Sequence, residues 1–278
     1  NLISLIEHER VHEVLVIDKG KLIGMISSKR LTQKSIADPD KTKVKSLLMS
    51  PPPQLNPNDS LDDAAKKILK SGLRALPVCE GGKVVGVLSI HDLIDEISKT
   101  KAFRQTKASA LMSPTVTMNE NDDIGKARYL MRDHNISRVP IVDISGKLKG
   151  IVTTFDMLKS VKTKERIGQG FAAATEMERI MQIPISTIIN KNAVTANMNT
   201  SLTDIAVLFN KEKTSGIVIT ENNEPKGIIV PKDLLEFHVG GLKSKGIFYQ
   251  VVGLAGEDEF IAGTANKMIE DTLKKLAA

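Results

Sequence analysis

The sequence predicts an α+β fold of four repeats, each with a strand, a helix, two further strands and a second helix. The first observation is a segment that recurs four times around a glycine, at spacings of 62, 64 and 77 residues. The second is the alternation, within each repeat, of β-branched runs with apolar residues at helical spacing. Repeats of about 60 residues with this order predict small sheets with helices on one face. The four glycines are Gly24, Gly86, Gly150 and Gly227.

The first repeat, residues 1–38, is predicted to begin inside a helix at residues 2–9, followed by a strand at residues 11–17. Its own opening strand is missing, and the sequence begins with Asn1 instead of methionine. We therefore expect the sequence to be an excerpt of a longer chain.

Three complete repeats follow, at residues 42–98, 106–163 and 183–238. Each opens with a short β-rich run, and a polar cluster then precedes an amphipathic helix. Two β-branched strands joined by a turn come next, and the second of them holds the glycine. A three-stranded sheet is too small to be stable alone, so we expect the repeats to pack sheet against sheet in pairs. The opening runs lie at residues 54–55, 116–118 and 193–195.

Residues 239–278 do not match the repeat. They contain a strand-like segment at residues 247–253 and a helix-like segment at residues 259–276. We expect this extension to dock against the repeats or to cap them.

The composition is that of a folded protein without disulfide bonds, because 41% of the residues are hydrophobic and 26% are charged. The lone Cys79 excludes an intramolecular disulfide and every multi-cysteine metal site. No run reaches the roughly 20 apolar residues of a membrane-spanning helix, so we expect a cytoplasmic protein that binds no membrane. The five histidines lack metal-site spacing, and no catalytic constellation or P-loop can be assembled. We predict neither a metal nor an enzyme.

A hydroxyl residue is followed three positions later by an acid, directly after the last strand, in two repeats: Ser89 with Asp92, and Thr153 with Asp156. This spacing is typical of a capping box, in which both side chains bind the first amides of a helix. Alternatively, the amides at the helix start attract a phosphate, and the carboxylate binds a ribose diol. The second interpretation points to a nucleotide.

The repeat resembles a known family, the cystathionine-β-synthase (CBS) domains. The resemblance rests on the order of elements, on a proline strand after the first helix (residues 74–77 and 137–140), and on the Gly-apolar-apolar-hydroxyl-x-x-Asp ending. It covers about residues 1–238 and implies that consecutive repeats pair into Bateman modules, two of which form a flat pseudo-symmetric disc. The arrangement is similar to the γ subunit of AMP-activated protein kinase and to stand-alone archaeal proteins. The implied ligand is AMP, ADP or ATP, with S-adenosylmethionine as a further candidate.

The resemblance also assigns ligand roles in the first two repeats. In the second repeat, Arg74 would lie near a phosphate, and Ser89 and Asp92 would lie at the ribose. In the first repeat, His12 and Ser27 are weaker candidates. Arg30 replaces the expected aspartate there, so a ribose contact is not implied.

In the third repeat, Arg138 would be the phosphate partner, and Thr153 and Asp156 would lie at the ribose. The fourth repeat keeps Asp233, a weaker candidate, but lacks the hydroxyl before it and the arginine and proline of the preceding strand. The residues expected to border the adenine are Thr115, Val116 and Thr117.

The net charge of +6 leaves two hypotheses open. Basic residues gather at residues 99–107 and 159–166, either as a solvated linker surface or as a contact for RNA. Our leading hypothesis is a non-catalytic, adenine-nucleotide-binding regulatory protein that acts on an unidentified protein partner, with a homodimer as a further expectation. The alternative is a ribosome- or RNA-associated factor that uses the repeats as a scaffold.

Overall fold

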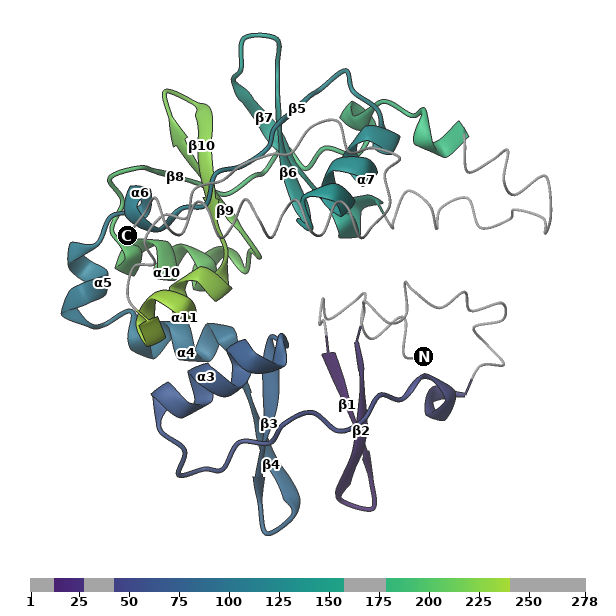
Figure 1. Ribbon diagram of the computed structural model, residues 1–278, viewed down its shortest axis with the longest axis vertical. Coiled ribbons are helices and arrows are strands. Elements are labelled where there is room, and N and C mark those ends of the chain that lie inside the picture. Colours follow the sequence, from purple (N-terminus) through teal and green to yellow (C-terminus); the bar gives the residue numbers. More distant parts are fainter. Residues whose placement is uncertain (1–12, 28–42, 158–178, 241–278) are drawn as a thin grey trace, which may run out of the picture. The chain divides into compact units, whose positions relative to one another are not determined.

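The computed structural model describes residues 13–27, 43–157 and 179–240 (Figure 1). These residues all belong to the first of the two units into which the chain divides, residues 1–241. The second unit, residues 242–278, lies outside the described residues together with the strand and helix that the sequence predicts there. The predicted helix at residues 2–9 lies outside them as well.

The strands form small sheets, and the helices follow them in the predicted order. The strands are β1 (Glu13–Asp18), β2 (Lys21–Ser27), β3 (Ala75–Glu80), β4 (Lys83–Ser89), β5 (Met118–Asn119), β6 (Arg138–Val142), β7 (Leu148–Thr153), β8 (Thr195–Asn197), β9 (Ile217–Glu221) and β10 (Glu224–Ile229). The helices are η1 (Val44–Leu47), α3 (Leu61–Ser71), α4 (Ile90–Ile97), α5 (Lys101–Gln105), α6 (Ala108–Leu111), α7 (Ile124–Asp133), η2 (Ile185–Thr187), α10 (Leu202–Glu212) and α11 (Pro231–Gly240). None of the described helices is both long enough and apolar enough to cross a membrane.

Four antiparallel hairpins, β1–β2, β3–β4, β6–β7 and β9–β10, share one register. In each hairpin the repeat glycine pairs with the middle strand, as Val16 pairs with Gly24 and Val78 pairs with Gly86. The residue just before each glycine is then skipped, which is a β-bulge. The first hairpin therefore has the same construction as the other three. The skipped residues are Ile23, Val85, Lys149 and Lys226.

The opening strands lie one or two residues later than predicted. Strand β5 pairs in parallel with β6, and β8 pairs in parallel with β9, through residues that include Asn119 and Asn197. Asparagine has a low strand propensity, so local composition places these strands too early. In the second repeat only Leu55 makes the equivalent bridge, to Val78.

In the third and fourth repeats, the segment that precedes the opening strand of each repeat pairs with the last strand of the other repeat. Ser113, ahead of the third repeat's strand, exchanges two backbone hydrogen bonds of 3.0 and 2.9 Å with Ile228 of the fourth. Asn190, ahead of the fourth repeat's strand, exchanges two of 3.0 Å with Ile151 of the third. This reciprocal exchange confirms the predicted pairing of consecutive repeats, and we call repeats three and four the second pair.

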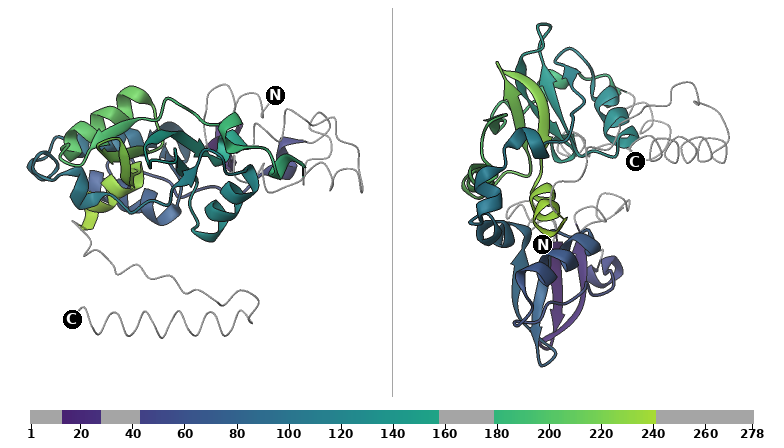
Figure 2. Two further views of the ribbon diagram at one scale, coloured as in Figure 1. Left: turned by 90° about the horizontal axis from the view of Figure 1, so that it is seen from above. Right: turned by 60° about the vertical axis from the view of Figure 1, so that its left-hand side comes forward.

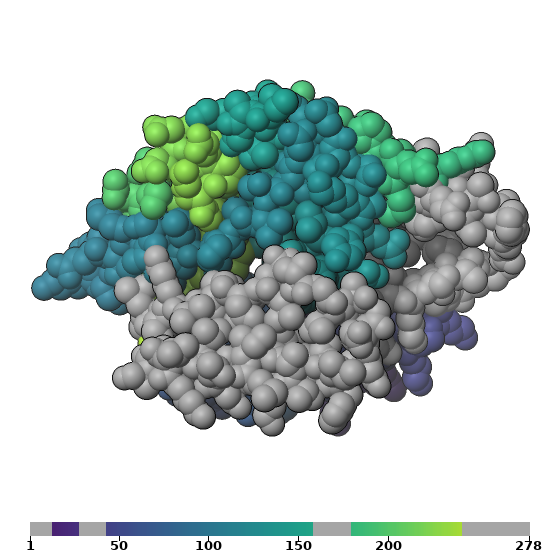
Figure 3. Space-filling model, turned by 45° about the horizontal axis from the view of Figure 1, so that its top comes forward, coloured from purple at the N-terminus to yellow at the C-terminus, as the bar shows by residue number. Residues whose placement is uncertain are grey.

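The turns of the second pair also touch. The backbone N–H of Leu148 donates to the carbonyl of Asn223, and the ammonium of Lys147 lies 3.1 Å from the carboxylate of Glu224. Figure 3 shows these two parts of the chain, teal and yellow-green, in contact at the surface.

Repeats one and two, the first pair, make half of the same exchange. Met49, ahead of the second repeat, exchanges hydrogen bonds of 3.3 and 2.9 Å with Met25 of the first. Among the described residues, no segment pairs with β4 of the second repeat in the way that Met49 pairs with β2 of the first. Accordingly Val85 and Val87 on β4 are 57% and 56% exposed.

The repeat glycines are required where one backbone crosses another. A Cβ added at Gly24, Gly150 or Gly227 would lie 2.5, 2.5 or 2.7 Å from the carbonyl oxygen of Met49, Asn190 or Ser113. At Gly86 it would meet no described atom within 4 Å. The recurrence of glycine thus follows from backbone packing at three of the four positions.

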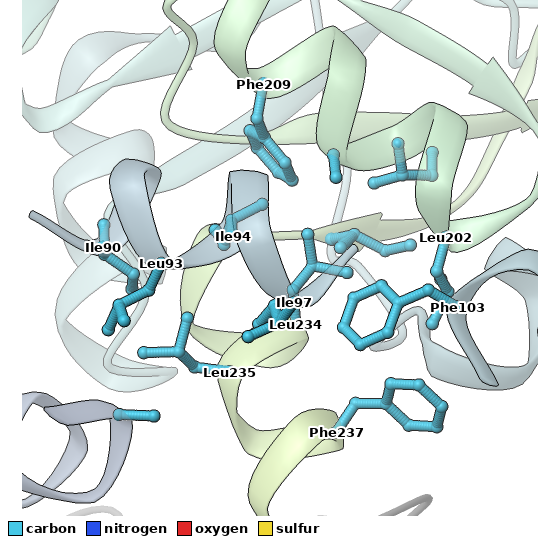
Figure 4. Close-up of a cluster of buried hydrophobic side chains, with 14 of the residues drawn as sticks. Ile90, Leu93, Ile94, Ile97, Phe103, Leu202, Phe209, Leu234, Leu235 and Phe237 are labelled. Carbon is cyan, nitrogen blue, oxygen red and sulfur yellow. The ribbon is translucent and has the colours of Figure 1, made fainter. Parts of the chain in front are cut away.

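A second contact joins repeats two and four through their helices. Helices α3 and α4 pack against α10 and α11, and their buried aliphatic side chains form one cluster with Phe103, Phe209 and Phe237 (Figures 1, 2 and 4). The rings of Phe103 and Phe237 meet edge to face with centroids 5.1 Å apart. A second cluster joins the third repeat to the beginning of the fourth and contains Met118, Ile141 and Ile185. Burial of this apolar surface is the main source of stability.

Candidate functional site

The two hydroxyl–acid pairs form complete caps. In each pair the carboxylate accepts the backbone N–H of the hydroxyl residue, at 2.8 Å for Ser89 with Asp92 and 2.9 Å for Thr153 with Asp156. Each hydroxyl donates to the same carboxylate oxygen at 2.6 Å, and each aspartate amide donates to the hydroxyl at 3.3 Å. The capping interpretation therefore holds. The same bonds fix each carboxylate at the first turn after the last strand, where the ligand interpretation needs it.

Asp233 occupies the same place in the fourth repeat without a hydroxyl partner. Its carboxylate accepts the backbone N–H of Val230 at 2.7 Å. Burial raises the pKa of Asp233 to about 6, against the lowering effect of the Val230 amide and the smaller lowering effects of Lys232 and Arg138. Asp233 is thus a buried acid whose charge is costly to the folded protein.

Asp233→Asn is expected to stabilise the protein above pH 6. Because the folded pKa exceeds the unfolded value of 3.8, the folded state holds the proton longer, and its stability falls as the pH rises from about 4 to about 6. The full cost is on the order of 3 kcal/mol. Asparagine still offers an oxygen to the Val230 amide. Melting temperatures of the two proteins across pH 3 to 8 should converge at the acid end, separate between about pH 4 and pH 6, and keep a constant difference above pH 6; a difference that does not change with pH over the whole range would contradict the assignment.

The starts of the middle strands face each other within each pair of repeats. The hairpin register places Glu13, Ala75, Arg138 and Gly216 at one equivalent position, and Arg74, Ser137 and Ser215 at the position before it. In the first pair, the backbone N–H of Arg74 donates to the Glu13 carboxylate. In the second pair, the Arg138 guanidinium donates to the hydroxyl of Ser215 at 3.3 Å.

Arg138 fits here because residue 216 is glycine. A Cβ at Gly216 would lie 2.8 Å from Cδ and 3.0 Å from Nε of Arg138. The arginine therefore lies directly over the backbone of the neighbouring repeat, which leaves its Nε buried. Within the described parts of the chain, this Nε has no hydrogen-bond partner.

The charge of Arg138 is poorly compensated. Burial and, to a smaller extent, the Arg74 guanidinium lower its pKa to about 10, and the Asp233 carboxylate acts against both. Burial also lowers the pKa of Arg74, against the effect of Glu13. Two half-buried guanidinium groups that repel each other, one with a buried Nε–H that has no partner among the described residues, form a site that favours an anion.

The remaining candidates lie at the ends of strands or outside the described residues. Thr115 and Val116 are half-buried and Thr117 is exposed, in the segment directly before β5. Ser27 ends β2, and its hydroxyl lies 3.6 Å from the sulfur of Met49. His12 lies outside the described residues.

Sequence reasoning did not select Glu13, Ser215 or His91 as site residues. Glu13 and Ser215 could have been found by aligning the strand starts of the four repeats. His91 follows Ser89 on α4, and burial lowers its pKa while Arg74 lowers it further. Its ring packs edge-on to Phe209, with centroids 6.4 Å apart.

The alternative RNA contact gains no support from the linker. Lys99 pairs with Glu96 at 2.6 Å, and the Arg104 guanidinium donates to the carbonyl of Lys99. The second basic stretch, residues 159–166, lies outside the described residues. No cluster of metal-ligating side chains occurs among the residues that are described.

Comparisons with known proteins agree with this architecture. The chain is 31% identical over 280 residues to the uncharacterized protein MJ1404 of Methanocaldococcus jannaschii. The aligned region covers 99% of this chain and 65% of MJ1404, so the chain spans slightly less than two thirds of that relative. An uncharacterized conserved protein of Pyrococcus horikoshii has the same fold, with a TM-score of 0.59 and 24% identity over 82% of this chain and 91% of its own. MJ1225 of M. jannaschii, described as a proposed archaeal homologue of γ-AMPK, has a TM-score of 0.66 and 16% identity over 85% and 91%.

The family itself is shown by a model of the CBS domain. This model matches three successive segments, residues 44–99, 108–163 and 185–240. Together they cover more than half of the chain, and each contains one of the hairpins described above. The chain therefore belongs to the CBS domain family.

Proposed function

We propose that this protein is a non-catalytic regulator that binds an adenine nucleotide, AMP, ADP or ATP, in its paired repeats. The single observation that carries the proposal is the half-buried guanidinium of Arg138, whose buried Nε has no hydrogen-bond partner among the described residues. A buried donor without an acceptor costs the folded protein free energy, and a phosphate oxygen would supply that acceptor. The sequence resemblance and the family membership support an adenosine compound as the source of the phosphate.

The acids at the helix starts would complete the recognition of a nucleotide. Asp92 and Asp156 are held by their caps, and Asp233 is held by the Val230 amide, so all three are preorganised. A carboxylate fixed in this way can accept both hydroxyls of a ribose. S-adenosylmethionine also carries a ribose but no phosphate, so it would use the acids without the arginines.

Ligand binding would act on the packing of the repeats. Arg138 comes from the third repeat and Ser215 from the fourth, so a ligand at their contact would touch both repeats at once. The fourth repeat in turn packs through α10 and α11 against the second. A ligand at 100 times its dissociation constant would add about 2.7 kcal/mol of stability. We infer that this change in packing alters the affinity for a regulated protein partner.

Titration calorimetry with AMP, ADP, ATP and S-adenosylmethionine tests the proposal. Binding of an adenine nucleotide below millimolar is expected, and the triple variant Asp92→Asn, Asp156→Asn and Asp233→Asn should weaken it by at least tenfold. Asparagine keeps an oxygen for each helix-start amide, so the caps should survive.

The matched control is Asp204→Asn. Asp204 makes the same 2.6 Å contact with the hydroxyl of Ser201 at the start of α10, where no ligand is proposed. Its variant should bind as the wild type does. Absence of binding below millimolar, or equal loss in the control, would contradict the proposal.

A further inference from the structure

The two pairs of repeats differ in charge at equivalent positions. In the second pair, Arg138 faces Ser215 and Gly216, neither of which carries a charge. In the first pair, the roles are reversed: Glu13 stands at the position of Arg138, and Arg74 stands at the position of Ser215. In the first pair, therefore, the carboxylate of Glu13 lies close to the arginine, Arg74.

The Glu13–Arg74 contact compensates both charges. Burial raises the pKa of Glu13, and Arg74 acts against that rise through its charge and its backbone N–H. Burial lowers the pKa of Arg74, and Glu13 acts against that fall. Arg138 and Asp233 also act on each other's pKa, but the Nε of Arg138 has no hydrogen-bond partner among the described residues, and the hydroxyl that its guanidinium faces is uncharged.

We propose that Glu13 makes the first pair reject phosphorylated ligands, so that each chain binds one adenine nucleotide phosphate, at Arg138 of the second pair. This inference rests on the proposed function. A phosphate that approached Arg74 would meet the Glu13 carboxylate at short range in a partly desolvated place, where like charges repel strongly. At Arg138 the phosphate meets an Nε–H without a hydrogen-bond partner among the described residues and the uncharged hydroxyl of Ser215. The ribose-binding acid Asp92 remains in the first pair, which suits an adenosine compound without a phosphate.

The test counts AMP sites by titration calorimetry on the whole chain. Wild type should bind one AMP, and Glu13→Gln should bind two, with the second site tightened at least tenfold. Glutamine keeps the size of the side chain and an oxygen for the Arg74 amide. Arg138→Gln should abolish AMP binding in the wild type but leave one site when it is combined with Glu13→Gln. Adenosine, which has no phosphate, should bind Glu13→Gln as it binds the wild type.

A second variant tests the same idea without touching the first pair. Ser215→Asp places an acid opposite Arg138, as Glu13 lies opposite Arg74, and should weaken AMP binding at least tenfold. Ser215→Asn has nearly the same shape without the charge and is the matched control. Unchanged AMP binding in Ser215→Asp would overturn the inference even if the Glu13 variant failed to fold.

Different experimental outcomes would contradict the inference and the proposed function. Two equal AMP sites in the wild type, unaffected by Glu13→Gln, would overturn the role of Glu13 and leave nucleotide binding standing. Silence of the wild type and of both Glu13→Gln and Ser215→Asn toward AMP and adenosine would overturn nucleotide binding itself, and the inference with it.

Discussion

Gly150→Ala is expected to lower the free energy of unfolding by about 1–3 kcal/mol, the usual cost of overpacking a well-packed site. The new Cβ would lie 2.5 Å from the carbonyl oxygen of Asn190 and would also overlap the side chain of Ile189. These atoms belong to the segment of the fourth repeat that crosses the last strand of the third. Backbone hydrogen bonds between Ile151 and Asn190 hold this segment in place. Relief of the overlap must shift backbone, which is harder than rotating a side chain.

Gly86→Ala is the matched control, because the same repeat position there meets no described atom within 4 Å. Its backbone lies outside the left-handed region, so alanine should be neutral or should stabilise by about 0.4–1 kcal/mol through the unfolded state. Urea unfolding monitored by circular dichroism measures both variants. Equal effects at Gly150 and Gly86 would show that backbone crossing does not explain the recurring glycine.

Arg138→Met is expected to weaken nucleotide binding by roughly 10- to 150-fold and yet to raise the stability of the ligand-free protein by about 1 kcal/mol. A buried, unpaired charge costs free energy that an apolar side chain of similar length does not. The phosphate, however, would lose at least one charge-assisted hydrogen bond, worth about 1.5–3 kcal/mol, or roughly 10- to 150-fold in affinity. Stability and function should therefore change in opposite directions, as is typical of a binding site.

The control is Arg128→Met, which removes an exposed arginine from α7 of the same repeat. It should leave both the melting temperature and the affinity for AMP nearly unchanged. A destabilised Arg138→Met protein would mean that Asp233 and Ser215 compensate the guanidinium better than the geometry indicates. Retained affinity would remove Arg138 from the site.

The local elements could be predicted because short-range rules determine them. Helix α3 begins after Ser60, whose side chain accepts the Asp63 amide, and ends at Gly72 in the left-handed conformation. The hairpins follow from β-branched runs, and the glycine recurs at one register position in all four. The capping geometry of Ser89 with Asp92 also follows directly from a spacing of three residues.

The contacts between repeats could not be predicted from local patterns. Arg138 and Ser215 are 77 positions apart, and no spacing rule links them. The hydroxyl of Thr203 donates to the carbonyl of Ser98 across the helix contact between repeats two and four, and this contact too depends on tertiary packing. The sequence assigns Arg138 to the third repeat's own acid, Asp156, whereas the structure directs its side chain toward Ser215 and Asp233 of the fourth.

The most direct test of the central claim is the phosphorus-31 spectrum of AMP titrated with the protein. If Arg138 binds the phosphate, the resonance should shift or broaden in proportion to the protein added, saturate at one equivalent, and change far less with Arg138→Met at the same concentrations. The account would be contradicted if the AMP resonance did not change when wild-type protein was added in excess over AMP at millimolar concentration.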